Sequence, residues 1–180
     1  MNPFAYPKSR HRRKLSPPAY STYKPYKPYL REEFGSRCVY CCLPDGLKGP
    51  DAFGVDHYRP RKRFPALATT YSNLFYCCNC CNSRKSQFWP SAEQLRNQEF
   101  VPNPCDHVMF QHLQYKGPII DLKSPAGRQA EKVLDFNDRA SVEYRQFVLD
   151  LIAASMVTSK PANGGQVKTG QRSAAETELF

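Results

Sequence analysis

The chain has 180 residues, of which 26 are Lys or Arg and 16 are Asp or Glu, so its formal net charge is +10. This length suits one ordinary domain with room for tails, and 41% hydrophobic residues can supply a core. No apolar stretch approaches the roughly 20 residues of a membrane-spanning helix. The first residues are basic and proline-rich, which excludes a secretory signal. These features predict a cytoplasmic protein that binds an acidic partner.

The N-terminal segment, residues 1–28, is a basic arm. Residues 1–30 contain seven Lys or Arg, no acidic residue, six prolines and five tyrosines. Because proline fixes φ and lacks an amide hydrogen, we expect an extended or disordered segment. The arm could track phosphates with its cations and stack bases on its tyrosines. It could equally be a solubilising tail, or its tyrosines could pack on the domain.

The folded part should begin near Tyr29 with a short helix that Gly35 ends. Strand-like pieces broken by prolines follow at 53–76, and Ser91 can cap a short helix over 93–97. Later elements are a strand at 119–122 and helices at 125–134 and 141–157, the second capped by Ser141. One apolar face of the last helix should pack in the core: Tyr144, Val148, Leu151, Ile152 and Met156.

These elements divide the chain into four parts. They are the arm at 1–28, a core at 29–100, a strand and helix extension at 101–157, and a disordered tail at 158–180.

Eight cysteines are clustered in a way that indicates a metal site and not disulfides. Cys38 and Cys41 form one CxxC pair, and Cys78 and Cys81 form a second. Two such turns supply the four-sulfur tetrahedral shell that structural zinc favours, and a closed shell leaves no position for chemistry. The choice of ligands stays open, because Cys42, or the overlapping pair Cys77 and Cys80, could replace those assigned. The remaining cysteines should be small core residues: Cys42, Cys77, Cys80 and Cys105.

Residues between and after the two pairs suit phosphodiester hydrolysis. His57 titrates near neutral pH and can take a proton from water, while Asp56 and Asn82 offer hard oxygen ligands for Mg²⁺ or Mn²⁺. Adjacent strand residues point to opposite faces. Asp56 and His57 can therefore share a site only if the strand ends or bends there.

The ordered motifs DHxxP, Asn73-Leu74 and CxxCNxxK over residues 38–90 resemble the zinc-bound branch of the HNH endonucleases. The resemblance implies an α+β protein. It would have a ββα-metal core held by a four-cysteine zinc site, added C-terminal helices and disordered tails. It also implies that Asp56 and Asn82 hold one catalytic ion and that His57 is the general base. Asn73 would orient the histidine. Asn82 stands where many members have histidine, which makes Mg²⁺ or Mn²⁺ the expected ion.

Cations flank these motifs and could hold phosphates on either side of the cut DNA strand. Each could also be a solvated surface charge. They are Arg59, Arg61, Lys62, Arg63, Arg84 and Lys85.

The flanking segments 29–34, 101–106, 112–115 and 134–139 look like one subgroup of bacterial HNH proteins. That subgroup includes nuclease subunits of Septu-type and retron-associated anti-phage systems, so the resemblance implies a separate ATPase partner. The chain has no GxxxxGK[ST] phosphate loop and cannot be that ATPase. Two other classes remain open: a non-catalytic zinc module that binds nucleic acid, and a protein scaffold that uses the C-terminal helices.

Overall fold

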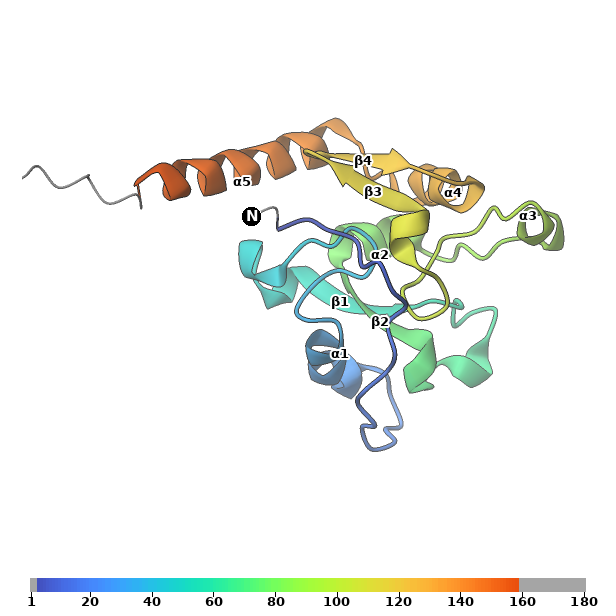
Figure 1. Ribbon diagram of the computed structural model, residues 1–180. Coiled ribbons are helices and arrows are strands. Elements are labelled where there is room, and N and C mark those ends of the chain that lie inside the picture. The colour runs from blue at the N-terminus through green and yellow to red at the C-terminus, as the bar shows by residue number, and fades with distance from the viewer. Residues whose placement is uncertain (1–2, 159–180) are drawn as a thin grey trace, which may run out of the picture.

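The computed structural model describes residues 3–158 and has a mixed α+β architecture built on two antiparallel hairpins. In the first, β1 (Phe53–His57) pairs with β2 (Leu74–Cys78), and α2 (Asn79–Lys85) follows β2 directly (Figure 1). The register places Phe53 opposite Cys78 and His57 opposite Leu74. All five residues of β2 are buried, so the ββα unit lies at the centre of the core.

The second hairpin, β3 (Leu113–Lys116) and β4 (Ile119–Leu122), leads into the C-terminal helices. The other helices are α1 (Lys27–Glu33), α3 (Ala92–Arg96), α4 (Pro125–Leu134) and α5 (Arg139–Thr158). The Ser91 cap, the strand at 119–122 and the helix at 125–134 are present as predicted. The helix predicted near Tyr29 is also present but begins earlier, at Lys27. Beyond residue 158, the predicted C-terminal tail lies outside the described residues.

Helix α5 differs from its prediction in two ways. It begins at Arg139, two residues before the predicted start. The side chain that caps it is that of Asp138, which accepts a hydrogen bond from the Ser141 amide, and not that of Ser141. Val148 is buried, but Leu151 is 55% exposed, and Figure 1 shows the helix extending away from the rest of the fold. The predicted core face is therefore wrong for Leu151, whereas Tyr144 and Ile152 are half-buried and pack against the core. The side chain of Met156 lies outside the described residues.

The N-terminal arm is extended, as its prolines predict, but it packs on the domain and is not disordered over its described residues. Phe4 and Tyr6 are buried, with their rings 5.5 Å and 5.4 Å from that of Tyr115. The Arg13 guanidinium lies over the Phe34 ring and donates to the Leu74 carbonyl of β2 at 2.6 Å. Of the alternatives that the sequence left open, packing of the arm's aromatic residues on the domain is the one observed.

A buried carboxylate, Glu33 of α1, fixes the middle of the arm. It accepts the backbone amides of Lys14 and Leu15 at 2.8 Å and 3.0 Å, the His11 ring nitrogen lies 2.7 Å away, and Tyr71 donates at 3.2 Å. Burial opposes ionisation of this group, but the hydrogen bonds together outweigh it and lower the pKa of Glu33. The ionised carboxylate therefore stabilises the folded arm.

Replacing Glu33 with alanine should destabilise the protein by about 2–4 kcal/mol, because buried donors lose a charged acceptor. The exposed neighbour Glu32 supplies the control, and Glu32→Ala should change the free energy of unfolding by less than about 0.5 kcal/mol. Because the folded-state pKa is lowered, the contribution is present above the ordinary pKa of glutamate and fades as the pH falls through the lowered value. Urea unfolding at neutral pH measures the free energy of unfolding of both variants. Equal effects of the two substitutions would contradict the role of Glu33 in holding the arm.

Candidate active site

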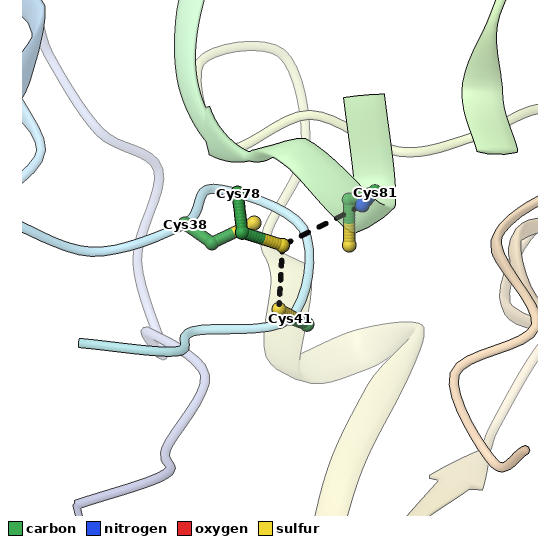
Figure 2. A group of neighbouring side chains, drawn as sticks. All are labelled: Cys38, Cys41, Cys78 and Cys81. Carbon is green, nitrogen blue, oxygen red and sulfur yellow. Dashed lines mark hydrogen bonds between the residues drawn. The ribbon is translucent and has the colours of Figure 1, made fainter. Parts of the chain in front are cut away.

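The four cysteines of the two predicted pairs come together at one point. Their sulfurs all lie within 4.8 Å of one another. In Figure 2, Cys38 and Cys41 come from the loop after α1, and Cys78 and Cys81 come from the end of β2 and the first turn of α2. Among the described residues this is the one group of three or more His, Cys, Asp or Glu placed to hold an ion. Four thiolates in this arrangement suit a structural zinc.

Local hydrogen bonds shape both cysteine turns. The amide of Cys42, which has a positive φ of 52°, donates to the carbonyl of Cys38 at 2.9 Å and closes the first turn. In the second turn the amide of Cys81 donates to the Cys78 sulfur at 3.5 Å. Contacts with the Cys38, Cys41 and Cys81 side chains, in that order, hold the pKa of Cys78 far below its usual value, whereas burial raises the pKa of Cys38 and contact with Cys38 raises that of Cys81. A thiolate is the form that binds metal.

The spare cysteines are not one class. Cys42 and Cys77 are buried, as predicted for small core residues, whereas Cys80 is exposed and Cys105 is half-buried. Neither Cys42, Cys77 nor Cys80 belongs to the group of converging sulfurs.

A polar cleft of about 420 Å³ lies between the end of β1 and α2. Asp56, His57 and Asn82 all line this cleft, together with Arg61 and, from the arm, Tyr23. The strand β1 stops at His57, which is the strand end that the adjacent Asp-His pair requires. Three of the four predicted catalytic residues thus line one cavity, whereas Asn73 is buried and does not line it.

His57 is held by a single defined hydrogen bond. Its Nε2 lies 2.9 Å from the Ala68 carbonyl, which can only accept, so Nε2 carries the hydrogen and the neutral ring has its lone pair on Nδ1. The Tyr23 ring meets the imidazole edge-on, with centroids 4.7 Å apart. Burial lowers the pKa of His57 below its ordinary value, although the Ala68 hydrogen bond opposes this. At neutral pH the imidazole is therefore free to take up a proton.

Asn73 hydrogen-bonds the backbone of the loop that carries Ala68, the partner of His57. Its Oδ1 accepts the Arg59 amide at 2.9 Å, and its Nδ2 donates to the carbonyls of Arg59 and Leu67 at 3.1 Å and 3.2 Å. The side chain is buried, so these bonds fix the loop between β1 and β2 from inside. Because Ala68 follows Leu67 directly, Asn73 holds the acceptor of the His57 hydrogen bond in place.

Asp56 is 3% exposed and contacts two side chains, those of Tyr40 and Lys85, that the sequence did not predict as its partners. The Tyr40 hydroxyl donates to Oδ2 at 2.6 Å, and the Lys85 ammonium lies 3.0–3.1 Å from both carboxylate oxygens. Tyr40 stands between the first pair of zinc-site cysteines, so this hydrogen bond joins the zinc site to the cleft. The sequence feature that could have drawn attention to Tyr40 is its position between Cys38 and Cys41.

The sequence of residues 38–88 matches the protein family described as HNH endonuclease. This segment is an HNH endonuclease domain. It contains both cysteine pairs, both strands of the first hairpin and α2. The cleft residues Asp56, His57 and Asn82 and the buried Asn73 also lie within it. No curated protein matches the chain. In the part of the chain that the structure describes, no helix is both long and apolar enough to cross a bilayer.

The HNH cleft offers oxygen donors that fit a divalent cation, which this family typically uses. Asp56 contributes a carboxylate, and Asn82 points Nδ2 toward the Val55 carbonyl at 3.5 Å, which leaves its Oδ1 as an acceptor. Carboxylate and amide oxygens are the ligands that Mg²⁺ and Mn²⁺ prefer, with water and phosphate completing the shell.

The predicted phosphate-binding cations of the HNH domain separate into two groups. Arg59, Arg61, Lys62 and Arg63 are exposed on the segment after β1. Of these, Arg61 lines the cleft and lies over the Tyr23 ring, and Arg59 lies over the Trp89 ring.

Arg84 and Lys85 form the second group, and both already have partners in the protein. Arg84 donates to the carbonyls of Leu134 and Asp135 and pairs with the Asp138 carboxylate at 2.9 Å, so it anchors the junction of α4 and α5. Lys85 is 2% exposed and faces Asp56. The Lys85 side chain is therefore enclosed, whereas the Arg84 side chain remains 30% exposed.

Proposed function

We propose that this HNH domain hydrolyses phosphodiester bonds of DNA with one divalent cation, Mg²⁺ or Mn²⁺, held by Asp56 and Asn82. The observation that supports it best is the state of His57. Its Nε2 is engaged by the Ala68 carbonyl, its pKa is lowered by burial, and its ring lines the cleft that also contains the two oxygen donors. A zinc module that only bound nucleic acid would have no need of a neutral histidine beside a carboxylate.

In the proposed reaction, Nδ1 of His57 removes a proton from water as the water oxygen bonds to phosphorus. The bond to the leaving oxygen breaks, and that oxygen takes a proton from solvent. The divalent cation, when bound, offsets negative charge on the phosphate and the leaving oxygen. Arg61 lies at the cleft and can bind a neighbouring phosphate, while Arg59, Lys62 and Arg63 extend the basic surface.

The experiment is nicking of a supercoiled plasmid, with single-stranded DNA as a parallel substrate. We expect cleavage with Mg²⁺ or Mn²⁺ and none with EDTA added briefly at a concentration that leaves the zinc in place. Asp56→Asn should abolish cleavage. DNA binding without cleavage in any metal would instead support the alternative, a non-catalytic nucleic-acid-binding or scaffold module. Cleavage equal to wild type in Asp56→Asn would refute the site.

We also propose that the nuclease serves a cytoplasmic anti-phage defence system with a separate ATPase subunit. The support is the similarity of the flanking segments to nuclease subunits of such systems. Co-purification from the native operon tests it. An ATPase that elutes with the nuclease supports the proposal, and a nuclease that elutes alone, with full activity and without effect on phage plating, counts against it.

A further inference from the structure

The candidate metal ligand Asp56 is already paired with a buried cation. The Lys85 ammonium lies 3.1 Å from Oδ1 and 3.0 Å from Oδ2, and both side chains are 3% exposed or less. Tyr40 adds a hydrogen bond to Oδ2 at 2.6 Å. A carboxylate has about four lone-pair sites, so a further partner can still bind from the cleft. The negative charge of Asp56, however, is balanced before any ion arrives.

Lys85 is fixed in this position. Its Nζ also donates to the His57 carbonyl at 2.9 Å and lies 5.9 Å from the centre of the Tyr58 ring. Asn82 and Lys85 are three residues apart in α2, so both face β1, where Asn82 reaches the carbonyl of Val55. Withdrawing Lys85 from Asp56 would leave two buried charges without an opposite charge beside them, which is strongly unfavourable. An incoming ion therefore meets the pair and not a free carboxylate.

The cleft provides no other negative charge to an ion. Among the described residues that line it, Asp56 is the one carboxylate, and Arg61 adds a positive charge at the edge. Affinity for hard cations rises with the number of charged ligands. The missing charge is what a phosphate group brings, since its oxygens are both anionic and good ligands for Mg²⁺ or Mn²⁺.

We infer that Lys85 is a positioning residue that makes binding of the divalent ion depend on the nucleic-acid phosphate. The free protein holds the ion weakly, and the phosphate to be cleaved completes the site. By reciprocity, the ion raises the affinity for DNA by the same factor. This inference rests on the proposed function, and it adds a coupling: the ion and the phosphate each bind more tightly when the other is present.

The first test measures Mn²⁺ binding to the free, zinc-loaded protein by electron paramagnetic resonance of unbound Mn²⁺. Lys85→Met removes the ammonium and keeps a long apolar stem, so Mn²⁺ should bind at least about tenfold more tightly than to wild type. Tyr40→Phe removes a hydrogen bond to the same carboxylate but no charge, and it should change the affinity less than about threefold. A folded Lys85→Met protein that binds Mn²⁺ no more tightly than wild type overturns the inference.

The second test needs no change at Lys85 and decides the matter if Lys85→Met does not fold. Mn²⁺ binding is compared for the His57→Ala protein, alone and with a short duplex, and the doubly substituted Asp56→Asn, His57→Ala protein with the same duplex gives the background. We expect the duplex to raise Mn²⁺ affinity at the Asp56 site at least about tenfold. A change below twofold overturns the inference. Plasmid nicking by wild type, run in parallel, separates this failure from failure of the proposed function.

Discussion

Replacing Cys38 with serine should remove the zinc and unfold the HNH domain in one step. Cys38 contributes a sulfur to the four-cysteine group, and its amide and carbonyl also bind the Leu43 carbonyl and the Cys42 amide at 2.9 Å. Zinc binding contributes roughly 10–16 kcal/mol in small zinc domains, which is comparable to or larger than the 5–15 kcal/mol by which whole domains are stable. A serine hydroxyl is a poor zinc ligand, so this contribution is largely lost.

The effect of Cys38→Ser should extend to the cleft. Tyr40, two residues along the same turn, donates to Asp56, and the Val39 amide donates to the Tyr76 carbonyl of β2 at 3.0 Å. Loss of the turn therefore loosens both a strand of the ββα unit and the candidate metal ligand. We expect nuclease activity to disappear together with the zinc.

Metal analysis and circular dichroism on the same preparation measure this prediction. Wild type should contain about one zinc per chain, and Cys38→Ser should contain none and lack a cooperative thermal transition. Cys80→Ser is the matched control, because Cys80 is an exposed cysteine adjacent to Cys81 that lies outside the sulfur group. It should keep both zinc and melting temperature. A Cys38→Ser protein with wild-type zinc content and stability would refute the assignment.

The zinc ligands and cleft residues could be predicted because their spacing is itself the physical requirement. Two residues between cysteines permit one turn to aim both sulfurs at one ion. An Asp-His pair can share a site only at the end of a strand, and β1 ends at His57. These are constraints between residues close in the chain, and a single sequence displays them.

Contacts between distant segments were not predictable in this way. A lysine in the last turn of a helix is normally exposed, and the burial of Lys85 depends on Asp56, which lies 29 residues earlier. The sequence left open whether the arm packs on the domain, because a segment rich in Lys and Arg is usually exposed to solvent. In the structure, half-buried His11, Arg13 and Leu15 alternate with exposed neighbours, which shows that the arm packs on the domain. The sequence alone does not reveal this alternation.

The C-terminal helix shows the opposite error. Its apolar residues recur at helical spacing, which predicts a face but not what covers it. Val148 packs in the core, whereas Phe147 and Leu151 are 58% and 55% exposed.

Replacing His57 with alanine should lower the cleavage rate by about 10²–10⁴-fold without unfolding the protein, which is the usual contribution of a general base. His57 is half-buried at the edge of the cleft, and its ring makes one described hydrogen bond, to Ala68, so its loss costs little stability. His112 supplies the control, since it is also half-buried but bonds Ser124, outside the cleft. His112→Gln should cleave at the wild-type rate, provided that its melting temperature is unchanged.

The pH dependence of cleavage separates a base from a merely structural histidine. The pKa of His57 is lowered, chiefly by burial, so the neutral ring that can accept a proton predominates above that lowered value. The wild-type rate should rise with pH through a pKa below the ordinary value of about 6.5 and then level off before neutral pH. His57→Ala should lose this rise and keep only a low rate that follows hydroxide concentration. A variant that retained the same pH profile at a reduced rate would assign the proton transfer to another group and reduce His57 to a structural part of the cleft.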